Sequence, residues 1–162
     1  MSIVSSQEFT IEHLKDIYDS EIQLIDAVTD MRGQASSDDI QQMMDHINSQ
    51  TQEFVEKLEI VGEKQNIQHD WIKSAGVEGL VQQHTTMFNV IDDALLKDNQ
   101  MLASLKSLLA YMEDKYETFG VYLASDFWKE IRDLVNARIA SIREEHLKVK
   151  TKLSEFSDAL GD

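Results

Sequence analysis

The chain has 162 residues, no proline, no cysteine and a formal net charge of −15. This length fits one domain that can bury a core of its own, and the lack of cysteine excludes disulfides, thiolate metal sites and a cysteine nucleophile. The negative charge argues against binding to nucleic acid or to an anionic membrane surface, because both need basic patches. A chain without proline is most simply built of long helices joined by short polar connections.

Apolar residues recur at helical spacing along almost the whole sequence. The first helix is expected to begin near Thr10 and to end at Gly33. The second is expected to begin within 36–38 and to end at Gly62, followed by a polar connection over 63–75.

Three further helices follow the polar connection. The third helix is expected to begin near Val77 and to end at Leu95. After a joint at Asp98 and Asn99, the fourth is expected to begin at Leu102 and to end at Leu123. Ser125 or Asp126 is expected to cap the fifth. Two tryptophans, Trp71 and Trp128, are expected to cover the ends of the helical bundle.

No strand pattern with a period of two competes with these helices. The sequence therefore predicts an all-α fold, an antiparallel bundle of four long helices with one additional helix. We expect a single domain over 1–162, with 1–9 and 158–162 loosely ordered. The start of the chain does not resemble a signal peptide and no apolar run is long enough to span a bilayer, so a cytoplasmic location is expected.

Polar residues on an apolar helix face are the most informative ones in a bundle. Glu21 lies one turn from Ile17 and one turn from Leu24, where an ionised carboxylate costs several kcal/mol unless it is paired or bound to metal. His146 lies on the apolar stripe of the last helix, so Glu21 and His146 either form a buried pair or share a metal ion. His84, on the third helix, is expected to be a hydrogen-bonded core histidine.

The last helix also differs from the rest of the chain in charge. Residues 1–100 carry 19 acidic and 6 basic residues, whereas the stretch 129–152 carries 4 acidic and 7 basic ones. We interpret this basic stretch as complementing acidic neighbours, either across the bundle or in a dimer partner.

Four short motifs resemble, in order and spacing, the ferritin-like stress proteins of the YciE/YciF type. They are Leu-Lys-Asp-Ile-Tyr-Asp-Ser-Glu over 14–21 with Gln23 and Leu24, Val-Glu-Lys-Leu-Glu over 55–59, Val-Glu-Gly-Leu-Val over 77–81, and Tyr-Glu over 116–117. The resemblance implies a ferritin-like bundle that is commonly a homodimer, is linked to stress responses and in some members holds a carboxylate-rich di-metal centre.

Carried over residue by residue, the resemblance gives an incomplete metal site. The candidate metal ligands are Glu21, Glu113, Glu117, Glu145 and His146. Gln50 stands where the family has an inward glutamate, Phe54 stands at the next ligand-type position, and Lys115 replaces a histidine. A complete di-iron centre is therefore not expected, although one iron or manganese ion at Glu21 and His146 remains an alternative.

Two functions stay open at this point. The first is a stress-associated, non-catalytic ferritin-like protein with an incomplete di-metal site, for which no catalytic or organic-cofactor residues are assigned. The alternative is an iron- or manganese-binding protein that acts on oxygen or peroxide. An acid–base enzyme that uses Glu21 with His146 ranks last, because neither a nucleophile nor a substrate pocket is visible.

Overall fold

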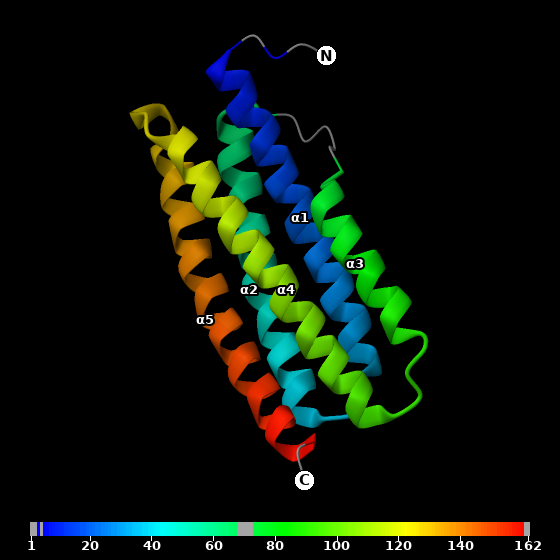
Figure 1. Ribbon diagram of the computed structural model, residues 1–162. Coiled ribbons are helices and arrows are strands. Elements are labelled where there is room, and N and C mark those ends of the chain that lie inside the picture. Colours follow the sequence, from blue (N-terminus) through cyan, green and yellow to red (C-terminus); the bar gives the residue numbers. More distant parts are fainter. Residues whose placement is uncertain (1–2, 4, 68–72, 161–162) are drawn as a thin grey trace.

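A computed structural model describes residues 3, 5–67 and 73–160 (Figure 1). The elements in this part of the chain are α1 (Ser6–Gln34), α2 (Asp38–Lys64), α3 (Ala75–Phe88), α4 (Ala94–Gly120), the short 3-10 turns η1 (Val121–Leu123) and η2 (Asp126–Trp128), and α5 (Lys129–Leu160). The predicted all-α bundle of four long helices and one additional, shorter helix is confirmed. Trp128 is buried at η2, whereas Trp71 lies outside the described residues.

The starts of α1 and α4 differ from the expected ones because side-chain caps lie further upstream, whereas α2 begins within the expected range. The Ser5 hydroxyl accepts a hydrogen bond from the Glu8 N–H at 3.1 Å, so α1 begins at Ser6, and the expected start at Thr10 was wrong. The third helix ends at Phe88, well before the expected end at Leu95.

The fourth helix begins eight residues earlier than expected. Asp93 caps α4 by accepting the Leu96 N–H at 2.9 Å, so the predicted joint at Asp98 lies inside the helix. The buried Asp98 carboxylate instead accepts three hydrogen bonds from the α1–α2 connection: the Ser36 and Ser37 N–H groups at 2.9 and 3.1 Å, and the Ser36 hydroxyl at 2.6 Å. Its polar side chain therefore stabilises a distant turn rather than a local one.

The four long helices enclose the core, and α3 lies outside them against α1 and α4 (Figure 1). The closest helix pairs are α1 with α2 and α4 with α5. Leu24, Met44, Leu105 and Ile142 represent the four long helices in this core, and all are fully buried. None of the described helices combines the length and apolar character needed to cross a membrane.

Candidate functional site

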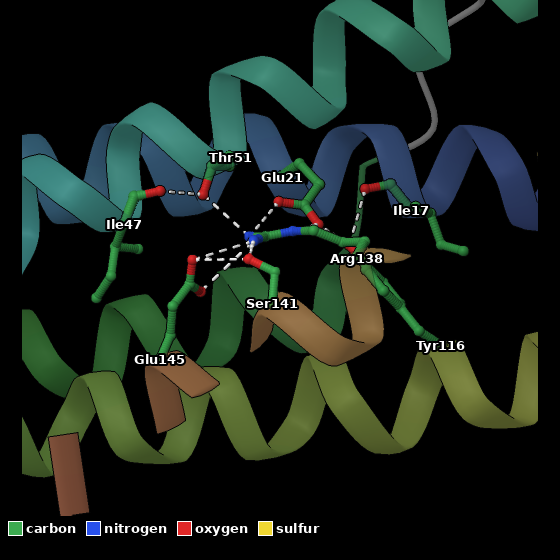
Figure 2. A network of polar contacts seen from close by, with 8 residues as sticks. All are labelled: Ile17, Glu21, Ile47, Thr51, Tyr116, Arg138, Ser141 and Glu145. Atoms are coloured by element: carbon green, nitrogen blue, oxygen red, sulfur yellow. Dashed lines mark hydrogen bonds and ion pairs between the residues drawn. The ribbon is translucent and has the colours of Figure 1, made fainter. Parts of the chain in front are cut away.

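A buried arginine lies at the centre of the bundle, between side chains of all four long helices (Figure 2). Glu21 points into the core as predicted, but its partner is Arg138 of α5. Arg138 Nε lies 3.0 Å from Glu21 Oε1, and Nη2 lies 2.9 Å from Oε2. The expected pairing of Glu21 with His146 was wrong, because a two-pronged guanidinium contact already satisfies this carboxylate.

The remaining donors of the guanidinium are also engaged. Nη1 lies 3.3 and 3.4 Å from the two carboxylate oxygens of Glu145 and 3.3 Å from the Ser141 hydroxyl. Nη2 also donates to Thr51 Oγ1 at 3.0 Å. Tyr116 completes the cluster by donating to Glu21 Oε1 at 2.7 Å. Arg138 therefore has a partner for each of its three nitrogens, which is what a buried charge requires.

The cluster contains two carboxyl groups but one guanidinium, and its electrostatics reflect that imbalance. Burial raises the pKa of Glu145 to about 7, and the charge of Glu21 adds to this effect against the opposing influence of Arg138. Burial alone would lower the pKa of Arg138, but the two glutamates raise it above its ordinary value. Burial and Glu21 also keep the pKa of Tyr116 well above its usual range, so its hydroxyl remains a donor.

The sequence of α5 explains why Arg138 faces inward. Six buried positions of this helix follow one another in steps of four and three residues, the spacing of a bundle seam. They are Ile131, Val135, Arg138, Ile142, Glu145 and Val149, and Ile139, next to Arg138, is buried as well. Sequence reasoning chose the neighbouring seam through Ile139 and His146, and so missed Arg138. On α2 the apolar spacing allows both Gln50 and Thr51 on the inner face, and sequence reasoning singled out Gln50. In the structure Gln50 is only half-buried, whereas Thr51 is fully buried.

The other metal candidates form a second cluster on the outer side of α4 and α5. Arg143 lies between Glu113 and Glu117, with its Nε 2.7 Å from Glu113 Oε1, and it forms an ion pair with Glu117. Hydrogen bonding from Arg143 lowers the pKa of Glu113. His146 Nδ1 is 3.5 Å from Glu113 Oε2. The five predicted ligands are thus divided between two places.

The residues present do not fit a di-metal centre. Such a centre in a bundle needs several carboxylates and imidazoles that converge from different helices. In the core, a permanently charged guanidinium lies between Glu21 and Glu145, and the Phe54 ring centroid lies 5.9 Å from the Arg138 guanidinium carbon. Among the described residues, no three His, Asp or Glu side chains are placed to hold a metal ion.

Lys115 belongs to a third polar cluster, which joins α4 to α1 and to the start of α3. Its ammonium lies 2.5 Å from Asp16 Oδ2, 2.7 Å from the Ser20 hydroxyl and 3.0 Å from the Ser74 hydroxyl. The Ser74 N–H donates to Asp19 Oδ2 at 2.6 Å. These contacts fasten α3 to the bundle and explain a lysine on the inner side of α4.

His84 has the structural role expected of it. The ring is buried, and its Nδ1 lies 2.6 Å from the Ser104 hydroxyl on α4. Burial lowers the pKa of His84, which favours the neutral ring. The prediction of a hydrogen-bonded core histidine is confirmed.

A known protein family matches the chain over most of its length. The model of a family described as a domain of unknown function, DUF892, matches residues 5–156 of the chain. The chain belongs to the DUF892 family. No curated protein matches the sequence.

Two solved structures share the fold of this DUF892 bundle. The E. coli stress protein YciF aligns with a TM-score of 0.88 at 16% identity, covering 96% of this chain and 99% of its own. YcfI of Rhodopseudomonas palustris aligns with a TM-score of 0.86 at 21% identity, covering 93% and 96%. The predicted likeness to YciF-type ferritin-like proteins is therefore confirmed, and at these identities it concerns the fold.

Proposed function

We propose that this DUF892 chain is a stress-associated, non-catalytic ferritin-like protein in which a buried ion network replaces a di-metal centre. The observation that carries the proposal is the position of Arg138, whose guanidinium lies between the carboxylates of Glu21 and Glu145. The link to stress comes from the fold shared with YciF, which is a stress protein.

The chemistry of the network supports a structural role. A catalytic metal needs an open coordination position in addition to its protein ligands. Here the carboxylates of Glu21 and Glu145 are both directed at Arg138, and the residue that α2 supplies is the neutral Thr51. A cation entering the core would meet the charge of Arg138 at short range and would have to break these contacts.

Elemental analysis tests the proposal. Protein expressed in air with added iron and manganese should contain far less than one metal ion per chain, both as purified and after dialysis against these metals. Two metals per chain that are lost in Glu21→Ala would overturn the proposal and favour the alternative, an iron or manganese protein that acts on oxygen or peroxide. Glu130→Ala, at an exposed position of α5, is the matched control.

We also propose that the protein is a cytoplasmic homodimer. The uneven distribution of charge supports association between copies: α5 carries seven basic and six acidic residues, whereas α1, α2, α3 and α4 are each net negative. Two copies of an acidic chain attract each other best where the basic helix of one meets an acidic helix of the other. Light scattering during size-exclusion chromatography should give twice the mass of one chain, and a monomer mass would overturn this proposal.

A further inference from the structure

The buried network holds its two carboxylates unequally. Glu21 accepts three hydrogen bonds, at 2.7 Å from Tyr116 and at 2.9 and 3.0 Å from two nitrogens of Arg138. Glu145 receives only longer contacts, at 3.3 and 3.4 Å from a single nitrogen of Arg138 and at 3.3 Å from the Ser141 hydroxyl. A carboxylate can accept about four hydrogen bonds, and N–H donors usually lie about 2.9 Å away. Glu145 therefore retains acceptor capacity that Arg138, held mainly by Glu21, does not use.

The network also carries one negative charge more than it pairs. When both are ionised, Glu21 and Glu145 share a single guanidinium, that of Arg138. The other contacts of the network come from neutral hydroxyl groups. A buried carboxylate without a full counter-charge is unstable, so it either takes up a proton or pairs with a cation that can reach it.

The side chain of Glu145 lines a depression of about 530 Å³ between α2 and α5. Ile47 and Glu145 are its buried residues, at 1% and 2% exposed. Met43 and Leu147 add apolar surface nearer to the solvent. Pockets for small molecules typically measure about 300–1,000 Å³ and combine apolar walls with a few polar groups. The depression therefore has the size and the lining of a small-molecule site with one buried carboxylate.

The other titratable side chains around this depression are Asp39, His46, Lys148, Lys152 and Glu155. The Lys152 ammonium lies 3.3 Å from Asp39 Oδ2 and 3.2 Å from Glu155 Oε2. The Lys148 ammonium lies 2.8 Å from Glu144 Oε1, and His46 is exposed on α2. Both lysines are thus paired with acids at the rim rather than directed at the core carboxylate. These three acids outnumber the two lysines, which favours a cation over an anion.

We infer that this depression binds a small organic cation, a primary ammonium group on an apolar body, and that the ammonium pairs with Glu145. The ammonium brings one positive charge and three N–H donors to the carboxylate that Arg138 holds weakly. The apolar body covers Ile47 and Leu147. A metal ion fits poorly, because it needs several ligands and no three Asp, Glu or His side chains converge in the described part of the chain. The inference depends neither on the proposed structural role of the network nor on the proposed homodimer.

Isothermal titration calorimetry of the full-length chain tests the site with two probes of equal chain length, hexylammonium and hexanol. The measurement is made at pH 8, where Glu145, with a pKa of about 7, is ionised. We expect hexylammonium to bind about tenfold tighter than hexanol or more, because a hydrogen bond to a charged group adds affinity of that order. Equal affinities for the two probes would overturn the inference.

Two variants separate the site from a general attraction of cations to an acidic chain. Glu145→Gln keeps the shape of the side chain and should abolish the preference for hexylammonium. Glu155→Gln, at an exposed position of the same helix and depression, is the matched control and should keep the preference. Equal losses in the two variants, or an unchanged preference in Glu145→Gln, would overturn the inference. Circular dichroism checks that each variant is folded.

Nuclear magnetic resonance locates the bound probe. The hydrocarbon chain of hexylammonium should show nuclear Overhauser contacts with the methyl groups of Met43 and Leu147. A second depression, of about 400 Å³ between α1 and α3, is lined by Asp26, Asp30 and Val81 and offers an acidic alternative. Contacts confined to Val81 and its neighbours would place the cation in that second depression and overturn the assignment to Glu145.

Discussion

The helix α5 carries two arginine–glutamate clusters, one buried in the core and one exposed on the surface. Arg138 and Arg143 each lie between two glutamates, but the Arg138 side chain is 1% exposed and the Arg143 side chain is 56% exposed. Water can replace the partners of Arg143, whereas nothing in the core can replace those of Arg138. The comparison teaches that burial, and not the identity of the partners, determines how much a charged cluster matters to the fold.

The largest expected effect separates the two arginines directly. Arg138→Ala leaves Glu21 and Glu145 buried without a counter-charge, so the free energy of unfolding should fall by about 3–5 kcal/mol. Arg143→Ala should leave it unchanged within the error of the measurement, because water solvates the freed carboxylates. Urea unfolding at pH 7 measures the loss of free energy of unfolding in each variant. Equal losses would contradict the conclusion that burial makes the Arg138 cluster more important to the fold than the Arg143 cluster.

The next effect concerns Glu145, because the core network holds two carboxyl groups but only one guanidinium. The pKa of Glu145 is about 7 in the folded protein and 4.5 ordinarily, so the folded state holds the proton more tightly. Ionised Glu145 therefore destabilises the fold, and its contribution to stability falls as the pH rises from about 4.5 to 7 and stays level above. Glu145→Gln should be more stable than the wild type at pH 8, by on the order of 2–3 kcal/mol, and this gain should disappear near pH 4.5.

Urea titrations from pH 4.5 to 8.5 follow this difference. Glu130→Gln, at an exposed position of the same helix, serves as the control and should show no such pH-dependent gain. A Glu145→Gln variant that is less stable than the wild type across the whole range would show that the ionised carboxylate stabilises Arg138.

A smaller effect isolates one hydrogen bond of the network. Thr51 and Thr85 both donate to the carbonyl four residues earlier in their helices, but only Thr51 also accepts from Arg138. Thr51→Val should therefore cost about 1–2 kcal/mol, because one buried guanidinium N–H loses its partner. Thr85→Val is the matched control on an exposed face. Equal costs for the two variants would show that the contact with Arg138 is unimportant.

The smallest effect concerns salt. At about 1 M salt the screening length is about 3 Å, so any contribution of the exposed Arg143 cluster should vanish. The loss caused by Arg138→Ala should stay nearly constant between low and high salt, because its partners lie in the core. Urea unfolding of each variant at the two salt concentrations gives the comparison, and a strong salt dependence for Arg138 would show that water reaches the network.

The sequence was sufficient to predict the helices and the inward position of Glu21, but not its partner. Glu21 stands out because aliphatic residues lie one turn before and one turn after it. On α5, two seams of equal spacing run side by side, one through Arg138 and Glu145 and the other through Ile139 and His146. Apolar periodicity favours the seam through Ile139 and His146, because it carries fewer charges. The seam through Arg138 becomes favourable only because the carboxylate of Glu21 lies across the bundle from it.

The start of α4 was missed for a related reason. Asp98 followed by Asn99 is typical of a turn when the chain is considered locally. In the structure, Asp98 serves a turn more than sixty residues away, at Ser36 and Ser37. Local propensity contains no information about such a distant partner, so this boundary depends on tertiary structure.

The polar links of this bundle also determine how it should fold. Asp98, Lys115 and Arg138 all connect the α4–α5 half of the chain to the α1–α2 half. Each half is a helical hairpin that can form early from local contacts, but these charges lose their water only when the hairpins dock. We therefore expect one late, all-or-none docking step, with the slowest amide exchange shared by all four long helices rather than confined to one hairpin.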